Sequence, residues 1–383
     1  MAIAPAGDDS EHDFLIGLAY LEGIDVENDN EKAVELITGA AEAGLSEALR
    51  KIMDMYRNGQ GVERDYVKAL EWHEKLLEQF RENWEKDKSE KTENLLMIEL
   101  QKFGDECMAL GRLDQAKDSY NEMLDISSEA VENGRRESRR DLSVSFERIG
   151  YIKEICSDLE GAMDSYEESL RIAKELSEET GMIDSLRNLS ISYSNVGDIQ
   201  QARGDLEGAR ASYEESLKIR KALCEETGMI EDHRNLSISY KNVGGIQEAR
   251  GDLEGAMSCY EEGLKIRKSL CEETGMIEDR RNLSISYKNV GGIQEERGDF
   301  ERARTSYEES LRIDKELSEE TGTIESKCDL VLGYCNLGTL DSDNHQNNYI
   351  LTAYKLITEF AEEYPRIDRF KEIKNAIELY LSE

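Results

Sequence analysis

Proline is almost missing from this sequence: Pro5 and Pro365 are the only two in 383 residues. Because proline ends or kinks helices, the long interval between them can form helices that only glycine interrupts. No apolar run approaches the roughly 18 residues that a membrane-spanning helix needs. The N-terminal segment MAIAPAGDDSEHDF lacks a basic region and a long apolar core, so no secretory signal is expected. These absences predict an all-α protein without a transmembrane segment.

Basic residues are scarce as well. The 48 Lys and Arg residues are outnumbered by 84 Asp and Glu residues, which gives a net charge of −36. Nucleic acids and anionic membranes bind to basic surfaces, so we expect neither as a partner. The acidic charge has two interpretations that both stay open, the solubility of a large surface and the selection of a basic partner.

Motifs for metal binding, redox chemistry and catalysis are also missing. The seven cysteines include no CxxC pair, and the four histidines are scattered. The cysteines therefore indicate reduced cytosolic thiols, and we expect no metal site and no cofactor. The sequence contains no phosphate-binding glycine loop, no HExxH and no GxSxG motif. We therefore expect a cytoplasmic protein that is not an enzyme.

The strongest positive signal is a period of 47 residues. A fixed period of this size predicts one helical unit that is stacked on copies of itself. Leucine, glycine and tyrosine each recur at this interval in five copies. The positions are Leu142, Leu189, Leu236, Leu283 and Leu330; Gly150, Gly197, Gly244, Gly291 and Gly338; and Tyr166, Tyr213, Tyr260, Tyr307 and Tyr354.

Each period predicts two helices joined by a short turn. Between Thr274 and Gly322, apolar residues recur at i, i+3, i+4 and i+7 in two segments of about 20 residues, or roughly 30 Å of helix. Gly298 suits a left-handed helix end, and Asp299 suits the N-cap of the next helix. The predicted fold is an all-α, right-handed superhelical solenoid of antiparallel helical hairpins.

Small and large residues follow a fixed pattern in these hairpins. The pattern is Tyr240, then Val243-Gly244, then Ala256 and Tyr260, and it recurs one period earlier and one period later. It resembles the pattern of the tetratricopeptide repeat (TPR) family. The period is longer than the usual length of about 34 residues, and the proline that normally ends the second helix is missing. The longer period suggests extended helices, as in the long-repeat branch that includes kinesin light chains. The resemblance implies a concave groove that binds peptides or proteins.

A shorter period marks the N-terminus. Four pairs of residues are 36 apart: Tyr20 and Tyr56, Gly23 and Gly59, Asp29 and Asp65, and Ala33 and Ala69. With these residues the sequence resembles the Sel-one-like repeat, a relative of the TPR hairpin. The two periods predict four regions. They are Sel-one-like repeats in 1–80, a charged junction in 81–91, five TPR-like hairpins in 92–326, and a degenerate repeat with C-terminal capping helices in 327–383.

Comparison of the copies separates a constant core from variable positions. Residues that differ between copies recur at spacings of four and three on the first helix, which puts them on one face. In TPR relatives this face lines the groove. Free drift of solvent-facing residues is the alternative, but it does not explain why Asn235 stays constant. The variable candidates for peptide binding are Ser194, Asp198, Gln201, Lys241, Glu248, Lys288, Glu295 and Glu296.

One residue on the groove side does not vary. Asparagine precedes the valine-glycine or leucine-glycine pair in four copies, as Asn195, Asn242, Asn289 and Asn336. A primary amide donates and accepts hydrogen bonds, which suits the backbone of an extended peptide. In long TPR relatives, similar asparagine ladders hold the main chain of bound peptides. The alternative is that these amides tie neighbouring helices together, and the sequence leaves both possibilities open.

The leading functional hypothesis is a non-catalytic scaffold or adaptor that binds an extended peptide or a partner domain in the concave groove. One alternative is a peptide-sensing regulator, because the chain also resembles bacterial TPR proteins of the Rap type. Another is an accessory or regulatory subunit of a larger effector complex.

Overall fold

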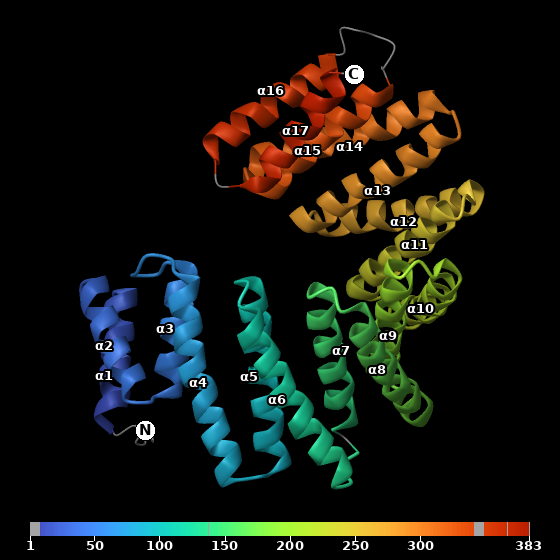
Figure 1. Cartoon of the computed structure of the whole chain (residues 1–383). Coiled ribbons are helices and arrows are strands. Elements are labelled where there is room, and N and C mark those ends of the chain that lie inside the picture. The colour runs from blue at the N-terminus through green and yellow to red at the C-terminus, as the bar shows by residue number, and fades with distance from the viewer. Residues whose placement is uncertain (1–7, 137, 341–347, 366, 383) are drawn as a thin grey trace. The chain divides into compact units, whose positions relative to one another are not determined.

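The computed structural model describes residues 8–136, 138–340, 348–365 and 367–382, and these residues form seventeen α-helices and no strand (Figure 1). Successive helices pack against each other along the chain, so the predicted all-α solenoid of helical hairpins is confirmed. None of the described helices is long and apolar enough to cross a membrane. The prediction about a secretory signal falls partly on residues 1–7, and the degenerate repeat predicted in 327–383 includes residues 341–347. Both of these segments lie outside the described residues.

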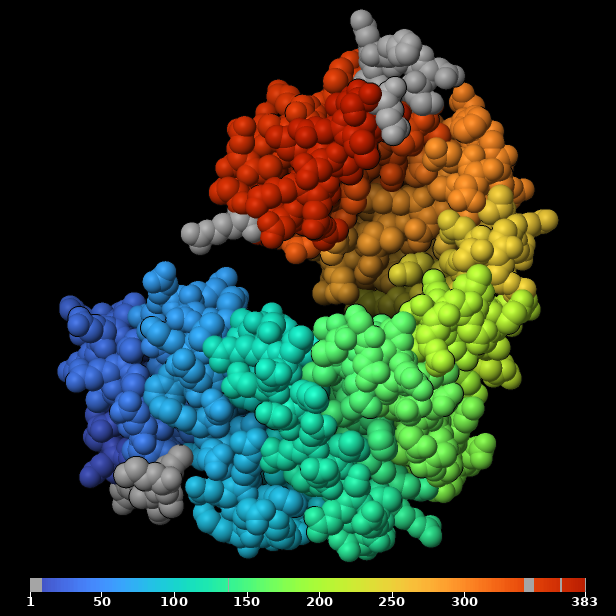
Figure 2. All heavy atoms as spheres, viewed as in Figure 1, coloured from blue at the N-terminus to red at the C-terminus, as the bar shows by residue number. Residues whose placement is uncertain are grey.

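The chain divides into two compact units, Met1–Leu176 and Ser177–Glu383. Within each unit, side chains of successive helices fill the spaces between the ribbons (Figure 2). Unit 1 contains α1 (Asp8–Glu22), α2 (Asn30–Glu42), α3 (Ser46–Asn58), α4 (Tyr66–Lys86), α5 (Glu90–Ala109), α6 (Leu113–Glu132), α7 (Arg139–Ile155) and most of α8 (Leu159–Thr180). Unit 2 contains α9 (Ile183–Ala202), α10 (Leu206–Thr227), α11 (Ile230–Ala249), α12 (Leu253–Thr274), α13 (Ile277–Glu296), α14 (Phe300–Thr321), α15 (Ile324–Leu340), α16 (Asn348–Glu363) and α17 (Asp368–Ser382).

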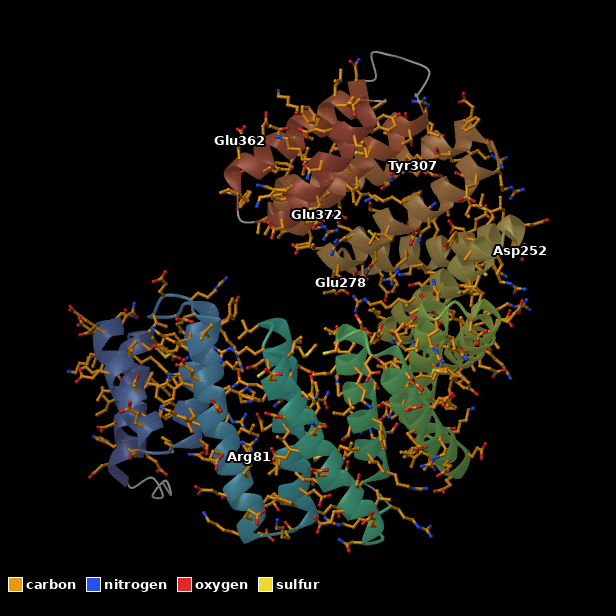
Figure 3. All side chains as sticks on the ribbon, in the orientation of Figure 1. Arg81, Asp252, Glu278, Tyr307, Glu362 and Glu372 are labelled. Carbon is orange, nitrogen blue, oxygen red and sulfur yellow. The ribbon has the colours of Figure 1, made fainter. Side chains whose placement is uncertain are left out.

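A glycine-aspartate pair makes the turn inside each regular hairpin of unit 2. Gly298 has a φ of +77°, and Asp299 accepts a hydrogen bond from the backbone N–H of Arg302. Asp205 and Asp252 cap α10 and α12 in the same way, and Asp252 is labelled in Figure 3. The glycine allows the left-handed turn, and the aspartate supplies an acceptor to the otherwise unbonded N–H groups of the next helix. The turn predicted from the sequence is therefore confirmed.

Inside each hairpin, a tyrosine ring lies against a glycine of the first helix. A Cβ atom on Gly244 would lie 2.7 Å from the ring of Tyr260, so no larger residue fits without a shift. The tyrosine is 7% exposed and belongs to the core of the hairpin. The same contact occurs in four other hairpins, as Gly104–Tyr120, Gly150–Tyr166, Gly197–Tyr213 and Gly291–Tyr307.

The last hairpin departs from the 47-residue period. The sequence pairs Gly338 with Tyr354, but a Cβ on Gly338 would instead lie 2.4 Å from Ile350. Tyr354 is partly buried, and its hydroxyl donates to Glu378 at 3.0 Å. The contact with Gly338 thus comes four residues earlier than the period predicts, which is about one helical turn. The same face of α16 therefore meets α15 in a shifted register.

Arginine–aspartate pairs hold neighbouring hairpins of unit 2 together. Arg187 on α9 donates to Asp232 on α11 at 2.9 and 2.8 Å, and Arg234 on α11 donates to Asp279 on α13 at 2.9 and 2.7 Å. The two aspartates are 2% and 0% exposed. The sulfur of Met229 lies 3.1 Å from Nη2 of Arg187, against the same guanidinium. We call these pairs the arginine–aspartate ladder.

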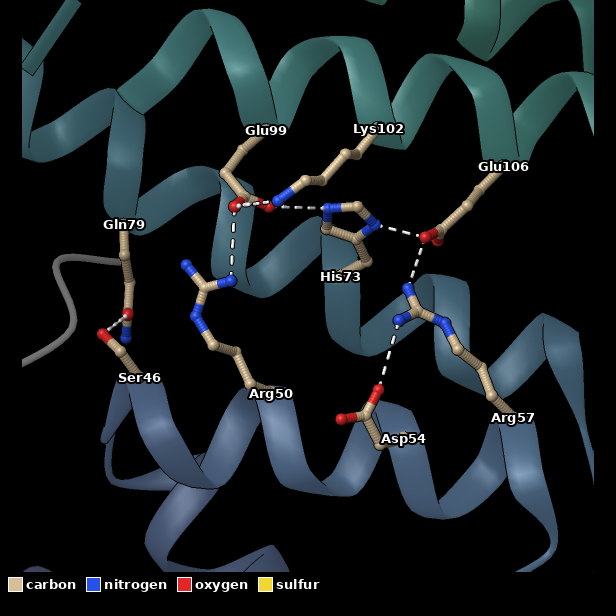
Figure 4. A network of polar contacts seen from close by, with 9 residues as sticks. All are labelled: Ser46, Arg50, Asp54, Arg57, His73, Gln79, Glu99, Lys102 and Glu106. Carbon is tan, nitrogen blue, oxygen red and sulfur yellow. Dashed lines mark hydrogen bonds and ion pairs between the residues drawn. The ribbon is translucent and has the colours of Figure 1, made fainter. Parts of the chain in front are cut away.

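The segment 81–91, predicted as a junction, comprises the end of α4, a short connection and the start of α5. Next to it, a buried polar network joins α3, α4 and α5 (Figure 4). His73 is 1% exposed, and its ring contacts Glu106 at 2.8 Å through Nδ1 and Glu99 at 3.3 Å through Nε2. Arg50 and Arg57, both on α3, form ion pairs with the same two carboxylates.

The charges of this network stabilise one another. Burial lowers the pKa of His73, but hydrogen bonds with Glu106 and Glu99 raise it by more, so the net pKa lies above its ordinary value. Burial raises the pKa of Glu99, whereas His73, Lys102 and Arg50 lower it to a net value of about 2. The imidazole is therefore favoured as a cation between two carboxylates. This network connects the first hairpins of unit 1 to the hairpins that follow.

Candidate functional site

The first helices of the hairpins in unit 2 carry two rows of asparagines on one face. On α9, Asn188, Ile191 and Asn195 are spaced by three and four residues, which aligns them on one side of the helix. We call the surface formed by this triplet and its counterparts the Asn–Ile–Asn face. The counterparts are Asn235, Ile238 and Asn242 on α11, Asn282, Ile285 and Asn289 on α13, and Asp329, Leu332 and Asn336 on α15.

The aliphatic row of this face is open to solvent. Ile191 and Ile238 are 36% and 40% exposed, and Leu332 is 36% exposed. The asparagines on either side are partly buried. Single exposed aliphatic residues are common on protein surfaces, but here they recur at one repeat position as an apolar strip along successive first helices, in which Ile285 is partly buried. Such a strip between polar rows is suited to contact with another protein.

The amide side chains of the four predicted asparagines have no partner within the described residues. Asn195, Asn242, Asn289 and Asn336 form no side-chain hydrogen bond there. The amides therefore do not tie neighbouring helices together in this structure, which was the alternative that the sequence left open. Each keeps its donors and its acceptor for water or for a ligand.

Four of the predicted polar residues accept hydrogen bonds from core tyrosines. The hydroxyl–acceptor pairs are Tyr213–Asp198 (2.5 Å), Tyr213–Gln201 (3.1 Å), Tyr260–Glu248 (2.6 Å) and Tyr307–Glu295 (2.8 Å). Burial, together with the bond to Glu248, raises the pKa of Tyr260 above its ordinary value. Variation at these positions between copies therefore changes the acceptor of a core hydroxyl as well as the surface.

Two further predicted residues differ in their exposure. Ser194 is 8% exposed, and its Oγ lies 2.9 Å from Oγ of Ser216 on α10. It therefore lies between the two helices of its hairpin and contributes little to the surface. Glu296, near the end of α13, is exposed.

The two predicted lysines are in different electrostatic environments. Nζ of Lys288 lies 2.9 Å from the carboxylate of Asp314, which is 1% exposed. Lys241, one period earlier, is exposed. The reason is that Arg267 occupies the repeat position of Asp314 in the preceding copy, so Lys241 has no carboxylate there to bind. Lys241 is available to a ligand, whereas Lys288 is already in an ion pair.

The second asparagine row and the arginine–aspartate ladder were not predicted from the sequence as parts of the site, although Asn235 stood out as constant. Asn188, Asn235 and Asn282 recur at the same interval of 47 residues, so the period alone could have identified this row. The ladder was harder to find, because Arg187 and Asp232 are 45 residues apart and lie on different hairpins. A contact between hairpins has no local spacing rule, unlike a contact along one helix.

Models of two repeat families match parts of the chain. The Sel1 repeat model matches residues 13–45 and 47–79, and a tetratricopeptide repeat model matches residues 191–269. The chain thus carries Sel1 repeats at its N-terminus and tetratricopeptide repeats further on, which confirms the resemblances found from the residues. No curated protein sequence is similar enough to this chain to count as a match.

Several solved structures have a similar arrangement of helices. BtubC (BKLC) from P. vanneervenii is 20% identical with a TM-score of 0.56, over 67% of this chain and 93% of that chain. A STAND protein with a tetratricopeptide repeat sensor from Pyrococcus horikoshii is 16% identical with a TM-score of 0.52, over 97% of this chain and 55% of that chain. The apo form of RapI is 12% identical with a TM-score of 0.47, over 81% and 99%. At these identities the first two establish the helical-repeat fold alone, and the third supports no argument.

Proposed function

We propose that the chain is a non-catalytic interaction scaffold that binds an extended segment of a partner protein along the Asn–Ile–Asn face. Sel1 and tetratricopeptide repeats are generally non-catalytic modules for protein interaction, so proteins are the expected class of partner. The position and chemistry of the face in unit 2 support the finer proposal of peptide binding.

The free amides of Asn195, Asn242 and Asn289 carry this proposal. An extended peptide exposes backbone N–H and C=O groups in alternation, and one amide side chain can bond to both kinds. Amides repeated from one hairpin to the next therefore bind a backbone whatever its sequence. The isoleucine row beside them adds apolar contacts to the side chains of the segment.

Specificity is then expected from the residues that vary around these rows. Lys241 is exposed beside Asn242, and Gly245, one turn further on, carries no side chain. A bound backbone can approach α11 closely at this glycine. We assign to Lys241 and Glu296, of opposite charge and on successive first helices, the discrimination between acidic and basic partner side chains.

The test compares two pairs of substitutions in the same two hairpins. Peptides are first selected from a displayed random library on the wild-type protein, and their affinities are then measured by fluorescence anisotropy. The variant Asn242→Ala with Asn289→Ala should bind at least tenfold more weakly. The control variant, Ser258→Ala with Thr305→Ala, changes exposed residues on α12 and α14 and should bind as the wild type does.

Thermal unfolding keeps this test independent of stability. Because the two amides form no hydrogen bond to the described residues, their removal should leave the melting temperature almost unchanged. Unchanged peptide affinity in the asparagine variant would exclude the Asn–Ile–Asn face as the binding site. Small-angle scattering with the selected peptide separates a passive scaffold from a sensor of the Rap type, since only the sensor is expected to contract.

A further inference from the structure

The arginine–aspartate ladder changes at its last step, between α13 and α15. In the step from α9 to α11, Nη2 of Arg187 contacts the sulfur of Met229 at 3.1 Å and the carboxylate of Asp232 at 2.8 Å. The next step repeats both contacts with Arg234 as the donor. In the last step, Thr323 and Ser326 occupy the repeat positions of the methionine and the aspartate. The thioether and the carboxylate that complete the two earlier steps are therefore missing.

Arg281, the arginine of this last step, forms fewer bonds than its counterparts. Its Nε donates to Asp329 at 2.7 Å, and its two Nη atoms form no hydrogen bond within the described residues. The side chain is 39% exposed, compared with 18% for Arg234 in the complete step. A guanidinium has five N–H donors in a planar fork, so most of the donors of Arg281 remain available.

A cavity of about 730 Å³ occupies the space at this step. Its walls include Met276, Ile277 and Leu317, and the side chain of Arg281 borders it. This volume lies within the range of about 300–1,000 Å³ that is typical of small-molecule sites, which are mostly apolar with a few polar groups. Glu278 at the start of α13, labelled in Figure 3, also borders the cavity.

We propose that this cavity binds a ligand with a carboxylate and a short, unbranched apolar tail. Such a ligand supplies the two groups that the last step lacks, an acceptor for the Nη atoms of Arg281 and an apolar chain like that of Met229. In each of the two complete steps, one guanidinium contacts a methionine sulfur and an aspartate carboxylate at once. The proposal does not depend on peptide binding at the Asn–Ile–Asn face.

Within the described residues, the charges around the cavity comprise two balanced pairs and two unpaired glutamates. Arg281 pairs with Asp329, and the buried Asp314 pairs with Lys288, so four of the charges cancel in pairs. Glu278 and Glu325 also border the cavity and repel a carboxylate, but both are exposed. Salt screens exposed charges more than it screens a direct hydrogen-bonded contact. Glu278→Gln should therefore tighten the binding of the ligand.

The experiment uses N-acetylmethionine as the probe and N-acetylmethioninamide as its uncharged match, with binding to the full-length protein measured by calorimetry. The wild-type protein should bind the acid at least tenfold more tightly than the amide. Arg281→Gln should abolish this preference. Two peptides, one with a free C-terminal methionine and one with an internal methionine, then distinguish a small molecule from the end of a partner chain as the source of the carboxylate.

A second variant keeps the test decisive if Arg281→Gln unfolds. Thr323→Met combined with Ser326→Asp restores the residues of the two preceding copies and should fill the cavity. This variant should lose the binding of every probe and should melt at a higher temperature. Asn242→Ala with Asn289→Ala should leave probe binding unchanged, which separates this site from the proposed peptide face. Equal binding of acid and amide, no binding of either, or unchanged binding in the filled variant would overturn the proposal.

Discussion

Tyr260 and Gly244 pack ring against backbone, and a Cβ on the glycine would lie 2.7 Å from the ring. Carbon atoms do not approach this closely without repulsion, so a methyl group there would force α12 away from α11. Gly263, on α12, has no such neighbour, because the nearest atoms to an added Cβ would be 3.6 Å away. The same chemical change should therefore have opposite effects at these two glycines.

Gly244→Ala should lower the free energy of unfolding by about 1–3 kcal/mol, because it overpacks the hairpin core. Gly263→Ala should raise it by about 0.5–1 kcal/mol, because alanine favours the helix and restricts the unfolded chain. Urea denaturation followed by circular dichroism measures both. If both substitutions change the free energy of unfolding in the same direction, the contact with the tyrosine ring does not restrict the size of the residue at position 244.

Arg234→Gln should lower the free energy of unfolding by about 3 kcal/mol, because it leaves the fully buried carboxylate of Asp279 without its main partner. Arg234→Gln combined with Asp279→Asn should recover part of this loss, since the buried charge is then gone. Arg312→Gln, which breaks two exposed ion pairs along α14, serves as the control and should change stability little. A double variant that is no more stable than Arg234→Gln alone would contradict this account.

The ladder also predicts how unit 2 responds to acid. Hydrogen bonds from Arg187 and Arg234 lower the pKa of Asp232 and of Asp279 below the ordinary value of 3.8. The unfolded chain therefore takes up these protons first as the pH falls. The stabilisation is complete above pH 3.8 and is lost as the pH falls through the lower pKa of the folded state. Denaturation measured across this range should show a shallower acid loss for Asp279→Asn than for the wild type.

The network around His73 predicts the opposite pH dependence in unit 1. The pKa of His73 is raised above 6.5 in the folded protein, so its stabilisation is complete below pH 6.5 and is lost as the pH rises through the folded pKa. The free energy of local opening in α3, α4 and α5, measured by hydrogen exchange and corrected for the base-catalysed rise of the intrinsic rate, should fall over this range. The charged groups of the network are Arg50, Asp54, Arg57, Glu99, Lys102 and Glu106.

His73→Gln should remove this part of the pH dependence, whereas His233→Gln on α11 should leave it in place. His233 is a suitable control because it is partly exposed, and within the described residues its ring hydrogen-bonds only to the backbone oxygen of Met229. An opening free energy of α3–α5 that is independent of pH in the wild type would contradict the assignment of the charge to His73.

The hairpins were predictable because their signals are local or strictly periodic. The turn at Gly298-Asp299 depends on backbone conformation and capping, which act over a few residues. The stacking of copies follows from the period itself. The period failed at Tyr354, because the place of the tyrosine ring is taken by Ile350 in a shifted register. No repeat pattern could show that shift, since it depends on the fit of α16 against α15.

The candidate site was only partly predictable, for a related reason. Helix periodicity placed Asn195 and Asn242 on one face, but it could not show whether their amides were already bonded. Lys241 and Lys288 share one repeat position, yet only Lys288 forms an ion pair with Asp314. That difference depends on the residue that the next helix supplies, and a pattern along one helix contains no information about it.

Each bridge of the arginine–aspartate ladder is encoded half in one copy and half in the next. Deletion of residues 233–279, one whole period, would still leave Arg187 with Asp232 and Arg281 with Asp329. The copies on either side of Asp232 differ at only nine of 47 positions, so we expect their coding sequences to share long matching stretches that favour recombination. Unequal crossing-over can therefore lengthen or shorten this protein by whole hairpins. In each product, every arginine still has an aspartate on the next hairpin to pair with.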